Sequence, residues 1–460
     1  MKLSRTSRAS IAVAAVAGLA SVGVVAPSEA ATRSTVVIVE SNALTSLNPS
    51  TPDTNLTINN DVAYLTGNGF NYYDDKKNLQ KNTVLGTYKI TKNSPKDFQV
   101  TYTVNKGRVW SDGTPIDGVD MLLSHVLSSS AYSKAAGLGD PASTDTKAAF
   151  DSLGYGGVYD SKVVGNPTLS ADKMSVTIRF DKPPPDWELL APGPSPVHTL
   201  EMLADNKKAL GTASANLAAK AQFLKDFTTK NTARLTKMGN VWTNSYNVNA
   251  VTAATSPLLL VSNGGFIIKS FTYGDKMTLV RNPKYTSGPA MATKNPIKTV
   301  VIKIIKDNTA AVQALRNGDI DIYDGQPDAA GLAQLQAIKS ATVYGGTSMT
   351  YEHVDVRVGA AQGDTTPYTG PFAGNSQKAQ DLRHAFLLAL PRDAILASQV
   401  LPFNPKGVVM NSHFTLPGQT GYDTIVKNSG VSKFTAGTQA DRTAAALALV
   451  KKHFPTASAD

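Results

Sequence analysis

The chain has 460 residues, 42% of them hydrophobic and 17% charged, so it is long enough to form two or three domains with substantial cores. Its 45 Lys and Arg against 35 Asp and Glu give a formal net charge of +10, but the basic residues are scattered along the sequence, which argues against a nucleic-acid partner. There is no cysteine, which excludes disulfide-linked partners, thiolate metal sites and a cysteine nucleophile.

The first 30 residues have the three parts of a secretory signal peptide. Lys2, Arg5 and Arg8 form a basic region, an apolar run covers Ile11–Val25, and small residues precede a cleavage point after Ala30. The apolar run is shorter than the ~20 residues that a membrane-spanning helix needs. We therefore expect a protein secreted into an extracytoplasmic compartment of the cell envelope. Because cysteine is absent, we do not expect a lipid-modified N-terminus.

The mature chain begins with a strand pattern. Ser34–Glu40 is a β-branched run typical of a buried strand, and the polar stretch Ser41–Asn55 predicts a loop after it. Tyr88–Trp110 predicts two strands, and apolar residues alternate with polar ones from Phe98 to Val104, as in a half-buried antiparallel strand.

A strand, a tight turn and a capped helix follow one another. Gly107–Pro115 contains Ser-Asp-Gly, which favours a turn, and its proline ends the strand. Asp117 is placed to cap a helix, with Asp120 three residues later in a capping-box position. Prolines between residues 183 and 196 predict a stiff connection, and Glu201–Phe227 predicts helix.

A second α/β region begins after Pro257. Leu258–Val261 is a strand candidate, and residues 266–271 and 276–281 predict a hairpin. Val300–Ile305, the helix pattern Asn308–Asn317 with Gly318 at its end, and the strand that starts at residue 320 form a βαβ unit. This unit implies a partly parallel sheet.

Signatures of a secreted hydrolase are missing from the sequence. It has no G-x-S-x-G segment, no H-E-x-x-H segment, and neither a phosphate-binding loop nor a dinucleotide fingerprint. We therefore expect no enzyme activity, no metal site and no cofactor. A convergent active site stays open as an alternative, because catalytic triads are assembled in space.

Five segments, in this order, resemble the landmarks of the family 5 extracellular solute-binding proteins, the oligopeptide, dipeptide and nickel group. They are Asn105–Pro115 with its Trp-Ser-Asp-Gly core, Ser262–Phe266, Leu279–Tyr285, Ala311–Asp321 and Arg383–Ile395. In the last of these, Pro391 stands where the family usually has Asp.

The resemblance implies an α/β, two-lobed periplasmic-binding-protein-like fold of the class II type with an extra N-terminal subdomain. On this basis residues 1–30 are the signal peptide, residues 31–262 form lobe I with a subdomain inserted at about 65–180, and residues 263–460 form lobe II. Family members usually run on and return to the first lobe, so we expect the C-terminal return to be truncated at Asp460.

The function implied is the substrate-binding component of an ABC importer, a monomer that captures a peptide between its lobes and delivers it to permease subunits and their ATPases. The alternatives left open are a non-peptide cargo, such as a nickel complex or an oligosaccharide, and a secreted hydrolase.

The residues expected to contact the ligand come from three segments. Asn263 and Gly264, followed by Gly265, match a segment that approaches the ligand main chain in peptide-binding relatives, and glycine permits such an approach. Glu40, Ser41 and Asn42 at the mouth of the first strand, and Tyr132 after the capped helix, complete the candidate set. Trp110, Asp112 and Gly113 are expected to be structural, as are Arg281, Asn282 and Tyr285.

Overall fold

The computed structural model describes residues 34–74, 78–143, 147–325, 329–344, 353–359, 366, 368–412, 415, 417–418 and 421–458. The predicted signal peptide lies outside these residues. No helix in the described part of the chain is both long enough and apolar enough to cross a membrane.

The first sheet has six strands in the order β12-β1-β11-β10-β9-β8. Its strands are β1 (Thr35–Glu40), β8 (Ala250–Val251), β9 (Phe266–Thr272), β10 (Lys276–Arg281), β11 (Thr299–Ile304) and β12 (Ile322–Tyr323). β1 runs parallel to both β11 and β12, with Thr35 opposite Thr299 and Ile38 opposite Ile322. The other pairs are antiparallel. The chain therefore forms the predicted hairpin and a βαβ unit, with the N-terminal strand between the two strands of that unit.

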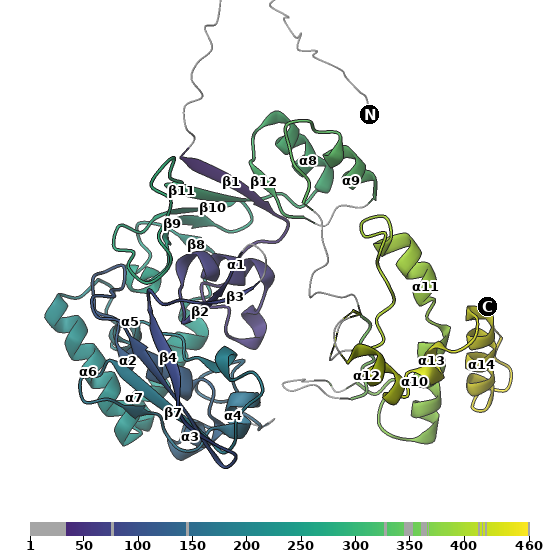
Figure 1. Cartoon of the computed structure of the whole chain (residues 1–460), viewed down its shortest axis with the longest axis horizontal. Helices are drawn as coiled ribbons and strands as arrows, with labels where there is room; N and C mark the ends of the chain where they lie inside the picture. The colour runs from purple at the N-terminus through teal and green to yellow at the C-terminus, as the bar shows by residue number, and fades with distance from the viewer. Residues whose placement is uncertain are drawn as a thin grey trace, which may run out of the picture.

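Helices cover both faces of this sheet, which explains why β1 is an unbroken apolar run (Figure 1). Val37 and Val39 pack on one face with residues of α8 (Asn308–Asn317). Val36 and Ile38 pack on the other face in the same cluster as α1 (Thr57–Thr66).

Cap residues fix both ends of α8, and the one at its end, Gly318, was predicted. Asp307 accepts a hydrogen bond from the backbone N of Ala310 at the start, and Gly318 adopts a left-handed φ of 76° at the end. Most residue types resist that conformation, whereas glycine adopts it at little cost. α9 (Ala329–Gln336) then packs beside α8.

A second sheet of four antiparallel strands has the order β4-β5-β7-β6. Its strands are β4 (Gly86–Ser94), β5 (Asp97–Val104), β6 (Thr168–Leu169) and β7 (Ser175–Phe180). The apolar residues of β5 that were predicted to be buried, Phe98 to Val104 at every second position, are buried. Two short strands, β2 (Asn71–Tyr73) and β3 (Leu79–Lys81), pair separately.

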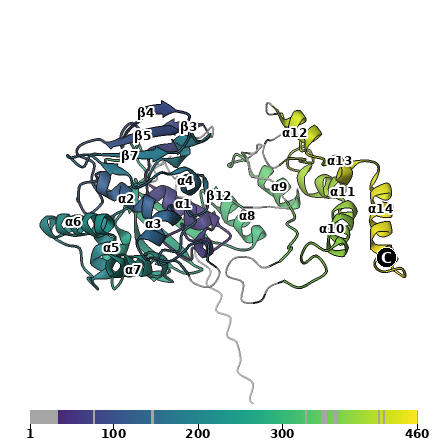
Figure 2. The same cartoon turned by 90° about the horizontal axis from the view of Figure 1, so that it is seen from below.

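Helices pack behind the second sheet and share its core (Figure 2). α2 (Gly118–Val126) begins with the predicted capping box between Asp117 and Asp120. The remaining elements here are α3 (Ser130–Ala135), α4 (Val158–Lys162), α5 (Val197–Ala204), α6 (Ala213–Thr229), α7 (Thr232–Asn240) and the π-helical turn Val241–Ser245. The common core runs from Phe70 to Val261, well beyond the predicted subdomain end near residue 180.

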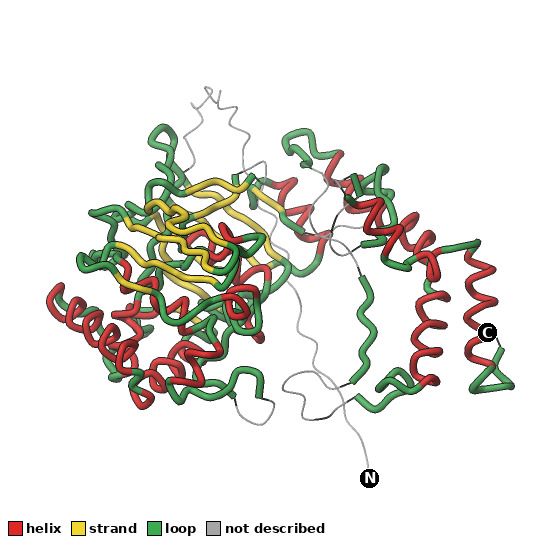
Figure 3. Tube along the Cα trace, turned by 60° about the horizontal axis from the view of Figure 1, so that its bottom comes forward, coloured by secondary structure: helices red, strands yellow, loops and turns green. Residues whose placement is uncertain are grey.

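The last helices gather at one side of the molecule, apart from both sheets (Figure 3). They are α10 (Gln377–Ala389), α11 (Arg392–Ile395) with the π-helical turn Leu396–Val400, α12 (Tyr422–Asn428), α13 (Ser432–Thr435) and α14 (Gln439–Lys451). α10 and α14 pack through Ala385, Leu388 and Ala446, and His453 lies 2.9 Å from Asp381.

One predicted element is wrong, one is interrupted, and one predicted boundary divides a sheet. The helix predicted over Glu201–Phe227 is interrupted between the end of α5 at Ala204 and the start of α6 at Ala213. Leu258–Val261 is not a strand, because Pro257 starts a 3-10 helix, Pro257–Leu260. Two other connections, Pro52–Thr54 and Trp187–Leu190, are also 3-10 helices. The predicted boundary between residues 262 and 263 separates β1 and β8 from β9–β12, although all of them share one sheet. A boundary after β12 agrees better with the pairing, and the division into lobes stays a prediction.

Candidate functional site

The carboxyl ends of the three parallel strands meet at one edge of the first sheet. β1 ends at Glu40, β11 at Ile304 and β12 at Tyr323. In open α/β sheets the crevice outside this edge is the usual place for a ligand. Ser41 and Asn42 continue directly from Glu40; Asn42 is exposed and donates only a long hydrogen bond to Ser41.

Three carboxylates from separate parts of the chain act on one another at this edge. Burial, together with the charges of Asp61 on α1 and of Asp324 just after β12, raises the pKa of Glu40 to about 7. Burial and the charge of Asp324 also raise the pKa of Asp61. The structure therefore brings Glu40 together with two acidic residues that sequence reasoning did not single out.

This acidic edge has no basic partner for Glu40 within the described part of the chain. No group of three or more His, Asp or Glu side chains in that part is arranged to hold a metal ion. The arrangement favours a ligand that carries a positive charge, because such a charge would relieve the repulsion between the carboxylates.

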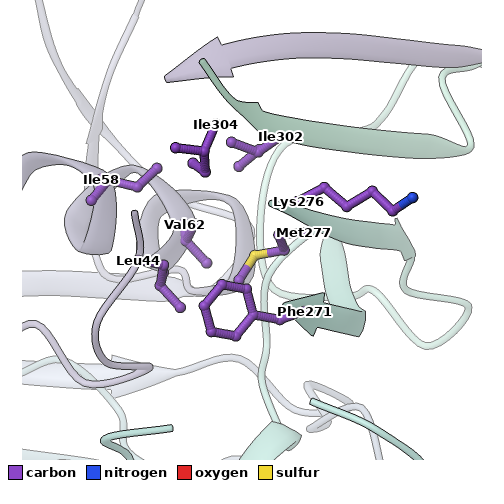
Figure 4. Close-up of a pocket in the computed structure, with 8 residues that line it drawn as sticks. All are labelled: Leu44, Ile58, Val62, Phe271, Lys276, Met277, Ile302 and Ile304. Carbon is purple, nitrogen blue, oxygen red and sulfur yellow. The ribbon is translucent and has the colours of Figure 1, made fainter. Parts of the chain in front are cut away.

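An apolar recess lies between α1 and the strands behind this edge (Figure 4). Ile58 and Val62 of α1 face Phe271, Met277 and the other side chains of the sheet. The recess holds about 10 Å³, which is room for about one water molecule, so it is part of the packed core rather than a binding pocket.

The segment Asn263–Gly265 lies against the end of α1. The side chain of Asn263 is buried; its Oδ1 accepts from the backbone N of Asn68 at 2.9 Å, and its Nδ2 donates to the carbonyl of Asn68 at 3.0 Å. The carbonyl of Asn263 accepts from the hydroxyl of Ser287. The polar atoms expected to contact a ligand main chain thus bind the chain's own main chain.

The two glycines that follow approach other parts of the chain closely. The N–H of Gly264 donates to the carbonyl of Thr66 at 2.8 Å, and a Cβ at Gly264 would lie 2.2 Å from the carbonyl carbon of Thr66. The carbonyl of Gly265 accepts from the N–H of Asn282 at 2.8 Å, and Met291 lies beside this glycine. Glycine is required at residue 264 because backbone, rather than a ligand, fills the space.

Tyr132 lies in the hydrophobic core behind the second sheet and not near the acidic edge. Its ring stacks on Phe227 with ring centroids 4.9 Å apart, and its hydroxyl donates to the carbonyl of Phe227 at 2.7 Å. The sequence placed it in a polar stretch, but it lies on α3, which turns this side chain inward.

The Trp-Ser-Asp-Gly turn is held together by buried polar contacts. Asp112 accepts hydrogen bonds from His198 at 2.9 Å and from Asn216 at 3.0 Å, which joins the turn to α5 and α6. Trp110 is buried, and Gly113 has a left-handed φ of 97°. These contacts agree with the structural role expected of the turn.

Residues 87–453 match the family described as bacterial extracellular solute-binding proteins, family 5 middle. The chain belongs to this family. Family 5 proteins bind solutes outside the cytoplasm and are not an enzyme family. The chain matches no curated protein.

Solved structures of other solute-binding proteins share the fold of this family 5 chain. It is similar to the periplasmic EDTA-binding protein EppA (18% identity, TM-score 0.57, covering 91% of this chain and 63% of that one). It is similar to an oligopeptide-binding protein of Thermus thermophilus in complex with a pentapeptide (16%, 0.57, 91% and 63%). It is also similar to OppA of Haemophilus influenzae in complex with the peptide RPPGFSPFR (17%, 0.57, 92% and 67%). The chain therefore spans 63% of the length of the first two.

The sequence of this family 5 protein points to the three carboxylates of this edge to different degrees. Glu40 was found because it ends the first strand. Asp324 carries the same signal, since it follows a short strand parallel to β1, but that pairing joins residues 284 apart (Ile38 opposite Ile322). Asp61 carries none, because a carboxylate on an amphipathic helix is ordinarily a solvated residue.

Proposed function

We propose that this chain is the extracytoplasmic binding component of an ABC importer and that its solute is a peptide. The observation that carries the proposal is the match of residues 87–453 to a family of solute-binding proteins. Two of the similar solved structures, those from Thermus thermophilus and Haemophilus influenzae, hold peptides, which supports the choice of solute.

The acidic edge supports a peptide on chemical grounds. A peptide carries a terminal ammonium group, and Glu40, Asp61 and Asp324 offer negative charge, with no basic residue among the described ones to neutralise Glu40. Ser41 and Asn42 add donors and acceptors for a main chain beside that charge. In this proposal two lobes close over the peptide, and the closed form is delivered to permease subunits and their ATPases.

Asn263, Gly264 and Gly265 have a supporting place in this proposal. They fix the end of α1, and α1 carries Asp61. A ligand role for the amide of Asn263 would require its two bonds to Asn68 to break. We therefore propose Glu40, Ser41 and Asn42 as the residues nearest the peptide.

A metal chelate is the second candidate solute, because the EDTA-binding protein EppA matches as well as the peptide-binding proteins do. The acidic edge disfavours it, since an anionic chelate would be repelled by the same carboxylates.

Isothermal titration calorimetry with pooled di- to hexapeptides tests the proposal, and N-acetylated pools of the same sequences provide the control. We expect heat from the free pools and binding that is about tenfold weaker for the acetylated pools, because acetylation removes the ammonium charge. A protein that unfolds cooperatively but gives no heat with any pool, and gives heat with a metal chelate, would move the assignment to the second candidate.

A further inference from the structure

A basic groove opens at the other end of the first sheet. β10 ends at Arg281 and β11 begins at Thr299, and both residues line the groove. It encloses about 890 Å³. Because β1 and β11 each run six residues between the two ends, the groove lies about 17 Å along the strands from the acidic edge.

The groove walls combine positive charge with apolar surface. Arg108, Arg281 and Lys298 line it together with Val84, Val280 and Met291, and none of the lining residues is acidic. The sequence shows the same bias: no acidic residue lies between residues 275 and 307, whereas seven Lys and Arg residues do.

The positive charges of the groove are not neutralised by the described part of the chain. Arg108, Arg281 and Lys298 form no ion pair there. The Nη1 of Arg108 donates to the carbonyl of Thr286, but its Nε is buried and has no acceptor. Three positive charges line the groove without a carboxylate beside them, so the groove favours an anionic group.

We infer that this groove docks the protein on the anionic phospholipid headgroups of a membrane surface. Arg108, Arg281 and Lys298 would neutralise the charge of the headgroup phosphates, and the apolar wall would lie against the acyl boundary. The inference rests on the proposed function, since it needs a protein that works beside a membrane.

The position of the groove would leave the acidic edge accessible to a ligand while the protein is docked. The groove lies at the amino-terminal end of β1, where the carbonyl of Ser34 accepts from the N–H groups of Lys298 and Thr299. Glu40 and its neighbouring carboxylates face the opposite end of the same strand. A protein held by the groove therefore keeps its acidic edge away from the membrane surface.

Vesicle co-sedimentation tests the inference with two matched double variants. We expect the wild type to bind vesicles that contain phosphatidylglycerol, to release them as salt rises, and to ignore pure phosphatidylcholine. R281E/K298E is expected to lower the partition coefficient by about thirtyfold. K207E/K208E, an equal change of charge just after α5, is expected to lower it by less than about threefold.

The outcomes separate this inference from the proposed function. Calorimetry with the peptide pools is expected to give the same affinity for R281E/K298E as for the wild type, so a failure of peptide binding alone leaves the vesicle result standing. Equal losses in the two double variants, an absence of vesicle binding, or retention by a soluble polyanion but not by vesicles would each overturn the docking. If R281E/K298E fails to unfold cooperatively, K294E/K298E, which changes two exposed side chains, takes its place.

Discussion

Glu40 is the residue whose ionisation matters most for the acidic edge. Its pKa is about 7 in the folded chain against an ordinary 4.5, because of burial and the charges of Asp61 and Asp324. Between these two values the folded protein holds a proton that the unfolded chain has released. Stability should therefore fall as the pH rises from about 4.5 to about 7.

Replacing Glu40 with Gln is expected to remove most of that pH dependence. Because Glu40 is only half-buried and solvent screens its charge, the expected gain at pH 8 is on the order of 1 kcal/mol. Urea unfolding at pH 4.5, 6 and 8 measures it, with Asp275→Asn as a control at an exposed carboxylate. If the free energy of unfolding of Glu40→Gln depended on pH as that of the wild type does, the raised pKa of Glu40 would not be the cause of that dependence.

Asn263 offers a second test at the residue scale. Replacing it with Ala removes both bonds to the main chain of Asn68 and leaves the half-buried N–H and carbonyl of Asn68 without these partners. We expect a loss of about 2–4 kcal/mol in the free energy of unfolding. Asn247→Ala, which removes one exposed bond, should cost less than about 0.5 kcal/mol. A variant with normal stability but lost peptide binding would instead restore the predicted ligand role of Asn263.

At the scale of elements, the contact between α1 and the start of β9 depends on Gly264. Ala at this position would place a Cβ 2.2 Å from the carbonyl carbon of Thr66, and backbone cannot yield as a flexible side chain does. We expect Gly264→Ala to destabilise the protein by about 3 kcal/mol, measured by chemical unfolding. Gly193→Ala, where open space surrounds the added methyl group, should be near neutral; equal effects at the two glycines would contradict the close approach.

Elements with a local signal could be predicted from the sequence, and elements defined by distant partners could not. The alternation in β5, the capping box of α2 and the left-handed Gly318 after α8 depend on neighbouring residues, and all were predicted. The strand predicted at Leu258–Val261 was wrong because an apolar run of four residues does not distinguish a strand from a 3-10 turn after proline.

The same limit applies to the sites. The scattered basic residues indicated no binding surface, yet the fold brings Arg108 of one segment beside Arg281 and Lys298 of another. Asp61 and Asp324 join Glu40 only because α1 and β12 pack at the end of β1. Pairing between distant segments decides which charged side chains lie together, and the periodicity of apolar residues in the sequence does not reveal that pairing.

At the scale of the whole molecule, the N-terminal strand lies inside a sheet made otherwise from residues 250–323. Deleting residues 34–42 would remove β1 from between β11 and β12 and leave the backbone edges of both without a partner. We expect the shortened chain to lose cooperative thermal unfolding, and the amides of β11 to lose protection in hydrogen exchange. A melting temperature equal to that of the undeleted chain would contradict a central role for β1.

Because Thr35 pairs with Thr299, β1 is synthesised long before its partner strand β11. A ribosome that adds 5–20 residues per second makes β1 roughly 13 to 53 s before the strand it will pair with. Throughout that interval Thr-Val-Val-Ile-Val is a β-prone segment without a partner, the kind of sequence that aggregates when left exposed. The first sheet therefore cannot close until residue 304 has been synthesised, and folding of this part of the chain comes late in synthesis.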